Sequence, residues 1–204
     1  MRLFGLFRAV FPLIACVILI HGATAGVLAG EATEQIRETT ERLIAVLTDP
    51  ALKGSARTQE RRQLIRRIAD QRFDWEEAAR RSLAQHWNGR TDEEKREFTA
   101  LFSDLLETTY MDKVDNYSGE EVLYVGENIE NGYGVVQVKI MTATDVEIPV
   151  EYRVKRKENG WFVYDISVEG VSLINNYRRQ FNSIILKSSY QDLVKRLKAK
   201  LASK

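Results

Sequence analysis

The chain has 204 residues, of which 44% are apolar and 29% are charged, and its formal net charge is +1. This length supports one sizeable hydrophobic core and is short for two domains. The near-neutral charge argues against a nucleic-acid-binding protein. The only cysteine, Cys16, lies near the N-terminus, so a chain processed beyond it has no disulfide, catalytic thiol or thiolate metal site.

The first 25 residues carry the features of a secretory signal peptide. Arg2 and Arg8 precede or flank an apolar run over residues 9–20, and the small residues of the segment 23–25 form a cleavage site. We expect cleavage after Ala25. Two alternatives remain open: residues 13–16 resemble a lipoprotein box with Cys16 acylated, and the apolar segment could stay as an uncleaved anchor.

Residues 26–204 are expected to form a single domain that begins with helices. Helical spacing of apolar residues predicts helices over residues 33–47, 58–72, 74–87 and 91–114. The third helix follows Asp74, and the fourth begins with Thr91 and Glu94 at the spacing of a capping box. The fourth helix presents an apolar stripe broad enough to cover a sheet.

The second half of the domain is predicted to start with four antiparallel strands. They cover about residues 122–125, 135–141, 146–155 and 161–168. The dipeptides at 131–132 and 159–160 are both Asn-Gly, a strong hairpin signal. Alternation of apolar and charged residues predicts a sheet with one apolar face.

A long helix from Ser172 to about Leu201 completes the predicted fold, because apolar residues after Gly170 recur at helical spacing. The fold class is therefore α+β, with a four-stranded antiparallel sheet covered on one face by several helices. Composition alone does not show whether the core is filled or hollow. The residues predicted to face this core are Phe98, Leu101, Phe102, Leu105, Val136, Val138, Ile140, Ile148, Val150, Tyr152, Phe162, Tyr164, Leu173, Tyr177 and Phe181.

Two residues are candidates for chemistry. His86 is the only histidine outside the first 25 residues, so a site with several histidine ligands is excluded. Asp165 lies within the fourth predicted strand, and strict alternation points it outward, solvated or ion-paired. A small secreted enzyme that uses Asp165 or His86 remains an alternative, although no nucleophile elbow or phosphate loop accompanies them.

Three segments resemble the MlaC, or toluene-tolerance, family of periplasmic phospholipid-binding proteins. They read RFDWEEAARRSLAQHW, FTALFSDLLETTYMDKVDNYSGEEV and WFVYDISVEGVSLINNYRRQF, and the similarity covers about residues 33–190. The resemblance implies a carrier that holds diacyl tails in an apolar cavity lined by the core-facing residues named above. The expected cavity volume is on the order of 1,000 Å³.

The resemblance also implies partners. They are an inner-membrane ABC transporter with an MCE-domain ring and an outer-membrane lipoprotein–porin complex, which together maintain lipid asymmetry. It implies no catalysis, cofactor or metal. Another lipid, such as a hopanoid, is an alternative cargo.

Overall fold

The computed structural model describes residues 30–203. The expected signal peptide, its cleavage after Ala25 and the alternatives at Cys16 lie outside the described residues. Within residues 30–203, none of the helices combines the length and the hydropathy that crossing a membrane requires.

The chain begins with two helices that are joined by short 3-10 turns. A carboxylate from the sheet holds the start of the first helix: Glu127 Oε2 accepts hydrogen bonds from Thr33 N at 2.6 Å and from Thr33 Oγ1 at 2.7 Å. Negative charge is favourable at a helix N-terminus. The elements are α1 (Glu31–Thr48), η1 (Pro50–Leu52), η2 (Ser55–Arg57) and α2 (Thr58–Asp70).

Side-chain caps fix the next two helices, α3 (Trp75–Leu83) and α4 (Asp92–Asp115), which are separated by the 3-10 turn η3 (Ala84–His86). Asp74 accepts from the backbone of Glu77, and Thr91 forms both bonds of a capping box with Glu94. The sequence prediction of both helix starts is confirmed.

The sheet is an antiparallel meander of five strands in the order β1-β2-β3-β4-β5. The prediction of four strands was wrong because the last strand is a two-residue segment, too short to show a period. It follows a reversal at Glu169 and Gly170, both of which have positive φ. The strands are β1 (Glu121–Glu130), β2 (Tyr133–Met141), β3 (Glu147–Lys157), β4 (Gly160–Val168) and β5 (Val171–Ser172).

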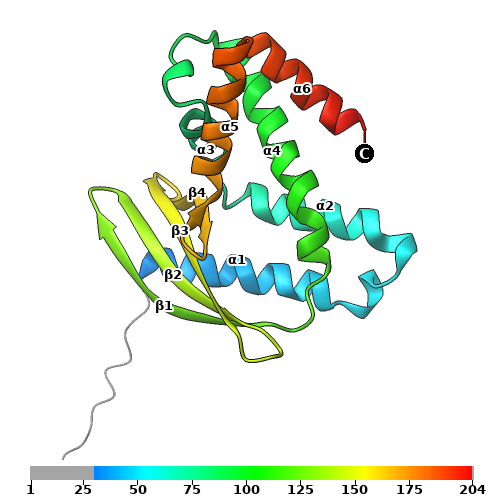
Figure 1. The fold of residues 1–204 in the computed structure, drawn as a ribbon. Coiled ribbons are helices and arrows are strands. Elements are labelled where there is room, and N and C mark those ends of the chain that lie inside the picture. Colours follow the sequence, from blue (N-terminus) through cyan, green and yellow to red (C-terminus); the bar gives the residue numbers. More distant parts are fainter. Residues whose placement is uncertain (1–29, 204) are drawn as a thin grey trace, which may run out of the picture.

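The C-terminal part contains two helices instead of the single helix predicted. They are α5 (Leu173–Lys187) and α6 (Tyr190–Ala202). The break falls at Ser188 and Ser189, and Ser189 Oγ accepts a hydrogen bond from Asp192 N at 3.0 Å. A serine side chain that accepts a hydrogen bond from a backbone N–H competes with the hydrogen bonds of a continuous helix, and this favours a break in the helix. Because of the break, α6 folds back beside α4 and α5 (Figure 1).

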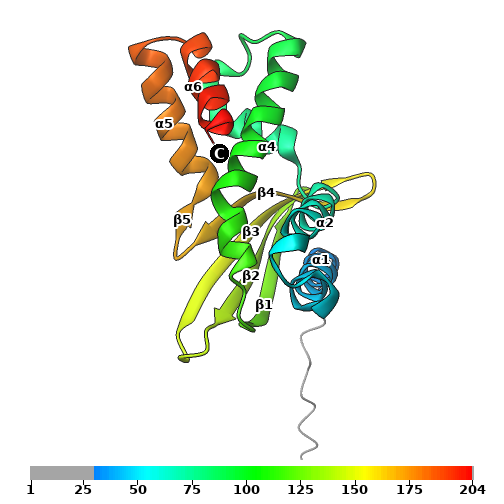
Figure 2. The ribbon, with the colours of Figure 1, turned by 90° about the vertical axis from the view of Figure 1, so that its right-hand side faces the viewer.

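Two separate hydrophobic cores result from this arrangement. The helical core lies among α3, α4, α5 and α6, of which α3 and α5 contact β4 (Figures 1 and 2). The sheet core lies between α1 and one face of the sheet, where Ala32 and Ile36 pack against Val136 and Val138. We call this the inner face, and the opposite side the outer face. The helices therefore do not form one layer over one face, although the α+β class is confirmed.

A β-bulge in β4 changes which of its residues face inward. Arg153 pairs with Asp165 while Val154 pairs with Val163, so Tyr164 is an extra residue. An extra residue breaks the alternation of the strand. As a result Tyr164 and Asp165 both lie on the outer face, and Phe162 lies there too.

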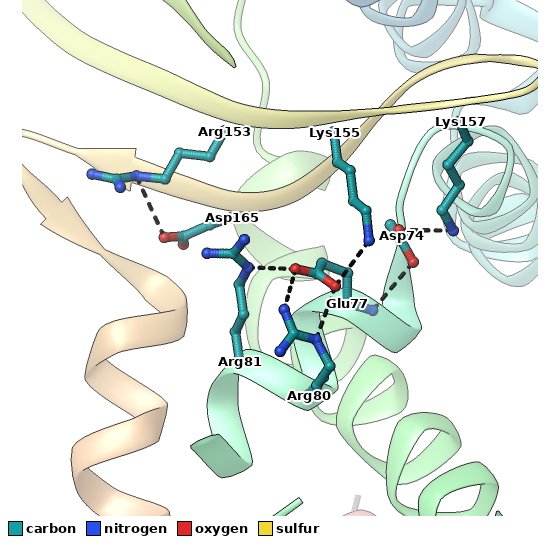
Figure 3. Close-up of polar contacts among 8 residues, drawn as sticks. All are labelled: Asp74, Glu77, Arg80, Arg81, Arg153, Lys155, Lys157 and Asp165. Carbon is teal, nitrogen blue, oxygen red and sulfur yellow. Dashed lines mark hydrogen bonds and ion pairs between the residues drawn. The ribbon is translucent and has the colours of Figure 1, made fainter. Parts of the chain in front are cut away.

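Ion pairs connect α3 to the outer face of β3 (Figure 3). The carboxylate of Glu77 lies 3.2 Å from Lys155 Nζ, and also contacts Arg80 at 2.6 Å and Arg81 at 2.7 Å. Asp74 Oδ2 lies 2.7 Å from Lys157 Nζ. Glu77 is only 5% exposed, so this carboxylate depends on its cationic partners for stabilisation.

Replacing Glu77 with glutamine is expected to weaken the acid sensitivity of folding. Burial favours the neutral form of Glu77, but hydrogen bonds from Arg80 and Arg81 outweigh burial and lower its pKa to about 2, from 4.5. A lowered pKa stabilises the folded state above pH 4.5, and this contribution is lost as the pH falls toward 2. Urea unfolding of both proteins between these pH values measures the difference. Identical pH profiles would contradict the assignment.

Candidate functional site

An apolar cleft with a volume of ≈ 530 Å³ lies between α1, the end of α4 and the inner face of the sheet. This volume is smaller than the roughly 1,000 Å³ expected from the resemblance. The helices contribute Leu43, Ile44 and Leu47 from α1 and Tyr110 and Val114 from α4. The sheet contributes Val122, Ile140, Ile148, Val150, Tyr152 and Val168.

The helical and strand periods of the sequence explain this wall. In β3, alternate residues Ile148, Val150 and Tyr152 lie on the inner face. In α1, the apolar stripe that begins at Ala32 and Ile36 continues along the same side of the helix. The first part of the stripe is buried against the sheet, whereas the later part is half-buried and lines the cleft.

The wall carries little charge. Tyr152 is half-buried, and desolvation of its hydroxyl raises the pKa of that group to about 12, so the group stays neutral across the physiological range. Lys113 and Glu120 contribute to the lining, and Lys113 is exposed. Such a wall favours hydrocarbon over polar or charged ligands.

The structure divides the residues that the sequence predicted to line one cavity. Ile140, Ile148, Val150 and Tyr152 lie on the wall of the cleft. Val136 and Val138 share the inner face but are covered by α1. Contact between lipid and these residues stays a prediction.

The aromatic residues of the predicted set pack elsewhere, in the helical core. The ring centroid of Phe102 lies 5.4 Å from that of Tyr177 and 5.6 Å from that of Phe181. Phe98 and Leu105 are also buried in this core, and Leu101 packs against it. These side chains fill the space between helices, and none of them is part of the cleft lining.

Three further members of the set also lie outside the cleft lining. Leu173 is the half-buried first residue of α5. Phe162 and Tyr164 are turned to the outer face by the bulge in β4, and Arg81 lies 4.0 Å from the ring centroid of Tyr164. Strict alternation, on which the prediction relied, does not hold across a bulge.

The set of residues predicted to line the cavity left out the helical part of the wall. The stripe of Leu43, Ile44 and Leu47 was visible as one face of an amphipathic helix, but its pattern is the same for a filled core and for a cleft. Tyr110 and Val114 continue the stripe of α4 at four-residue spacing from Leu106. Extending that stripe to the end of the helix was the signal available for finding them.

Asp165 and His86 have structural partners and do not line the cleft. Asp165 is 6% exposed, and its carboxylate accepts hydrogen bonds from Ser172 Oγ at 2.6 Å and from Ile174 N at 3.1 Å. Arg153 Nε lies 3.8 Å away. The expected ion pair is present, but Asp165 is buried at the start of α5 instead of solvated. His86 Nε2 lies 2.8 Å from Asn182 Oδ1.

Replacing Asp165 with asparagine is expected to lower the free energy of unfolding by about 1–2 kcal/mol, because the helix N-terminus loses its anion and one of two donors loses an acceptor. Thermal or urea unfolding measures the change, and the lipid content of the purified variant is expected to equal that of the wild type. A variant that loses the protein's function while its stability is unchanged would contradict a purely structural role and favour the enzyme alternative.

Comparison with known proteins assigns the family. The model of the MlaC protein family matches residues 37–199. An intermembrane phospholipid transport system binding protein MlaC from Haemophilus influenzae is 24% identical over 127 residues, which are 60% of this chain and 59% of that protein. The matched segment thus spans less than two thirds of this relative's length.

The fold has a solved counterpart. The structure of a phospholipid-binding protein from Ralstonia solanacearum, in complex with a phospholipid, superposes with a TM-score of 0.76 and 25% identity. The match covers 85% of this chain and 98% of that one. The sequence resemblance is therefore confirmed, and the chain belongs to the MlaC family.

Proposed function

We propose that this protein is a periplasmic carrier that holds the tails of glycerophospholipids in the apolar cleft and shuttles them between the outer membrane and the inner membrane. The observation that carries the proposal is the cleft itself, whose wall is formed by aliphatic and aromatic side chains of α1, α4 and the sheet. Family membership, the name of the Haemophilus relative and the phospholipid bound to the Ralstonia relative support it.

The energetics of lipid transfer explain why a carrier needs such a wall. Two acyl chains contain about thirty methylenes, and at ~0.8 kcal/mol each their transfer from a bilayer into water costs roughly 24 kcal/mol. A carrier lowers this barrier by covering the chains with carbon. The apolar contacts come from wall residues such as Leu43, Ile44 and Val150. Because a hydrocarbon wall discriminates weakly by chain length, the cleft accepts acyl chains of different length.

The proposed partners follow from the family resemblance. An inner-membrane ABC transporter with an MCE-domain ring and an outer-membrane lipoprotein–porin complex would each exchange lipid with the carrier. A carrier changes the rate of exchange and not its equilibrium, so the relative affinities of the partners set the direction of transfer. No catalytic step is part of this proposal.

Lipid extraction tests the proposal. The full chain is expressed in a bacterium with two membranes, recovered from the periplasmic fraction without detergent, and extracted for mass spectrometry. The expected result is about one glycerophospholipid per chain, the occupancy of a single ligand site. A lipid-free protein would overturn the carrier function, recovery from the cytoplasmic fraction would overturn the location, and a hopanoid would overturn the cargo.

Vesicle exchange tests the transfer step. Fluorescent phospholipid should move between donor and acceptor vesicles faster when the purified protein is present, and the rate should rise with protein concentration. A protein that retains its lipid and does not accelerate exchange would contradict the shuttle.

A further inference from the structure

A second pocket lies on the outer face of the sheet. Its volume is ≈ 310 Å³, and its wall is formed by α3, the turn after it, β3, β4 and the start of α5. Arg80, Arg81, Arg153 and Arg178 contribute to this wall. It shares no lining residue with the apolar cleft, which lies on the inner face. We call it the arginine pocket.

The carboxylates near the arginine pocket are already paired, Glu77 in part with two of the pocket's own arginines, so Arg153 and Arg178 are the arginines left to bind a ligand (Figure 3). Glu77 is held by Arg80, Arg81 and Lys155. Asp165 accepts from Ser172 Oγ and from the backbone N–H of Ile174 at the start of α5. These carboxylates therefore leave little acceptor capacity for further arginine N–H groups.

Several donors in the pocket remain unused. Arg153 Nε is buried and has no hydrogen-bond partner in the structure, because its 3.8 Å distance to Asp165 Oδ2 exceeds hydrogen-bonding range. Arg178 makes no hydrogen bond or ion pair with any of the residues 30–203. A buried donor without an acceptor is unfavourable, and a ligand that supplies the acceptor removes that cost.

The backbone at the pocket wall is strained as well. Ala84 has φ 49° and ψ −120°, a conformation that residues with a Cβ rarely adopt. Strain of this kind concentrates at ligand sites, where the surrounding structure enforces it. Here it accompanies the turn from α3 into η3, between Arg81 and Asn88 of the pocket wall.

We propose that the arginine pocket binds a phosphate group. Guanidinium groups donate paired N–H bonds that match the oxygens of phosphate, and arginine is preferred over lysine for such recognition. The pocket volume is at the lower end of the range for small-molecule sites, which fits a phosphate or a small phosphate ester better than a protein surface. Because the pocket shares no lining residue with the cleft, phosphate binding can be tested separately from the proposed carrier function.

Calorimetric titration of the purified full chain tests the proposal, with inorganic phosphate and glycerol 3-phosphate as probes in a chloride buffer. Saturable binding of either probe is expected, and a preference for the ester would assign the site to lipid headgroups, whereas a preference for phosphate would assign it to the free anion. Arg153→Gln and Arg178→Gln should each weaken binding about tenfold, the effect of losing one charge-assisted hydrogen bond.

Arg179→Gln is the matched control, since Arg179 follows Arg178 on α5, is exposed and lies outside the pocket lining. It should bind phosphate as the wild type does, and all three variants should keep the wild-type lipid content. Arg178 is also exposed, so its variant is expected to fold even if the Arg153 variant does not. Absence of saturable binding up to about 10 mM, a concentration that corresponds to negligible affinity, would overturn the proposal. Equal weakening by the Arg179 variant would also overturn it.

Discussion

Ile44→Asp is expected to reduce the phospholipid that co-purifies with the protein at least about tenfold while the fold is retained, because a carboxylate in contact with acyl chains loses its hydration. Ile44 lies on the wall of the cleft and is half-buried, so the new charge reaches water when no lipid is bound. Mass spectrometry of extracted lipid, normalised to protein, measures the effect.

Ala45→Asp is the matched control for this substitution. Ala45 is the next residue on α1, is exposed and does not line the cleft. The control adds the same charge to the same helix and should keep the wild-type lipid content. If the Ile44 variant carries as much lipid as the Ala45 variant, the cleft does not hold the acyl chains.

Phe102→Ala is expected to lower the free energy of unfolding by about 3–5 kcal/mol, the usual cost of removing a fully buried aromatic ring. Phe102 is 0% exposed, and its ring packs against those of Phe98, Tyr177 and Phe181. The loss should appear in urea unfolding, while the lipid content of the molecules that remain folded should match the wild type. That combination distinguishes a core residue from a residue of the cleft wall.

Leu186→Ala provides the comparison for Phe102→Ala. Leu186 lies on α5 but is 69% exposed, so its truncation should change the stability by no more than about 0.5 kcal/mol. A Phe102 variant that is as stable as this control but free of lipid would show that Phe102 contacts the lipid, as the sequence analysis predicted. It would also show that the helical core is hollow.

Local signals in the sequence predicted most of the elements. The capping box at Thr91 and the side-chain cap at Asp74 marked the starts of two helices to within a residue. The Asn-Gly pair at residues 131–132 marked the hairpin between β1 and β2, where both residues have positive φ. These signals are reliable because each one depends on a few neighbouring residues and not on tertiary contacts.

The residues of the candidate site were predicted only in part, because the features that the prediction missed depend on contacts between segments far apart in the sequence. The bulge at Tyr164 depends on how β4 pairs with β3, and the strand's own sequence gives no sign of it. Apolar stripes in α4 and α5 indicate burial but not the partner, so two cores were merged into one cavity. The β3 residues Ile148, Val150 and Tyr152 were placed correctly on the inner face because that strand keeps a regular alternation there.

The location of the cleft between the two cores has a mechanical consequence. If each methylene takes about 30 Å³, the volume of one water molecule in the liquid, the thirty methylenes of two acyl chains occupy roughly 900 Å³. The cleft has a volume of only ≈ 530 Å³. Tyr110 and Val114 belong to a helix of one core, whereas Ile148 and Val150 belong to the sheet of the other. Any widening of the cleft for two chains therefore requires the sheet to move relative to the helical bundle, and the ion pairs of Lys155 and Lys157 with Glu77 and Asp74 oppose that movement.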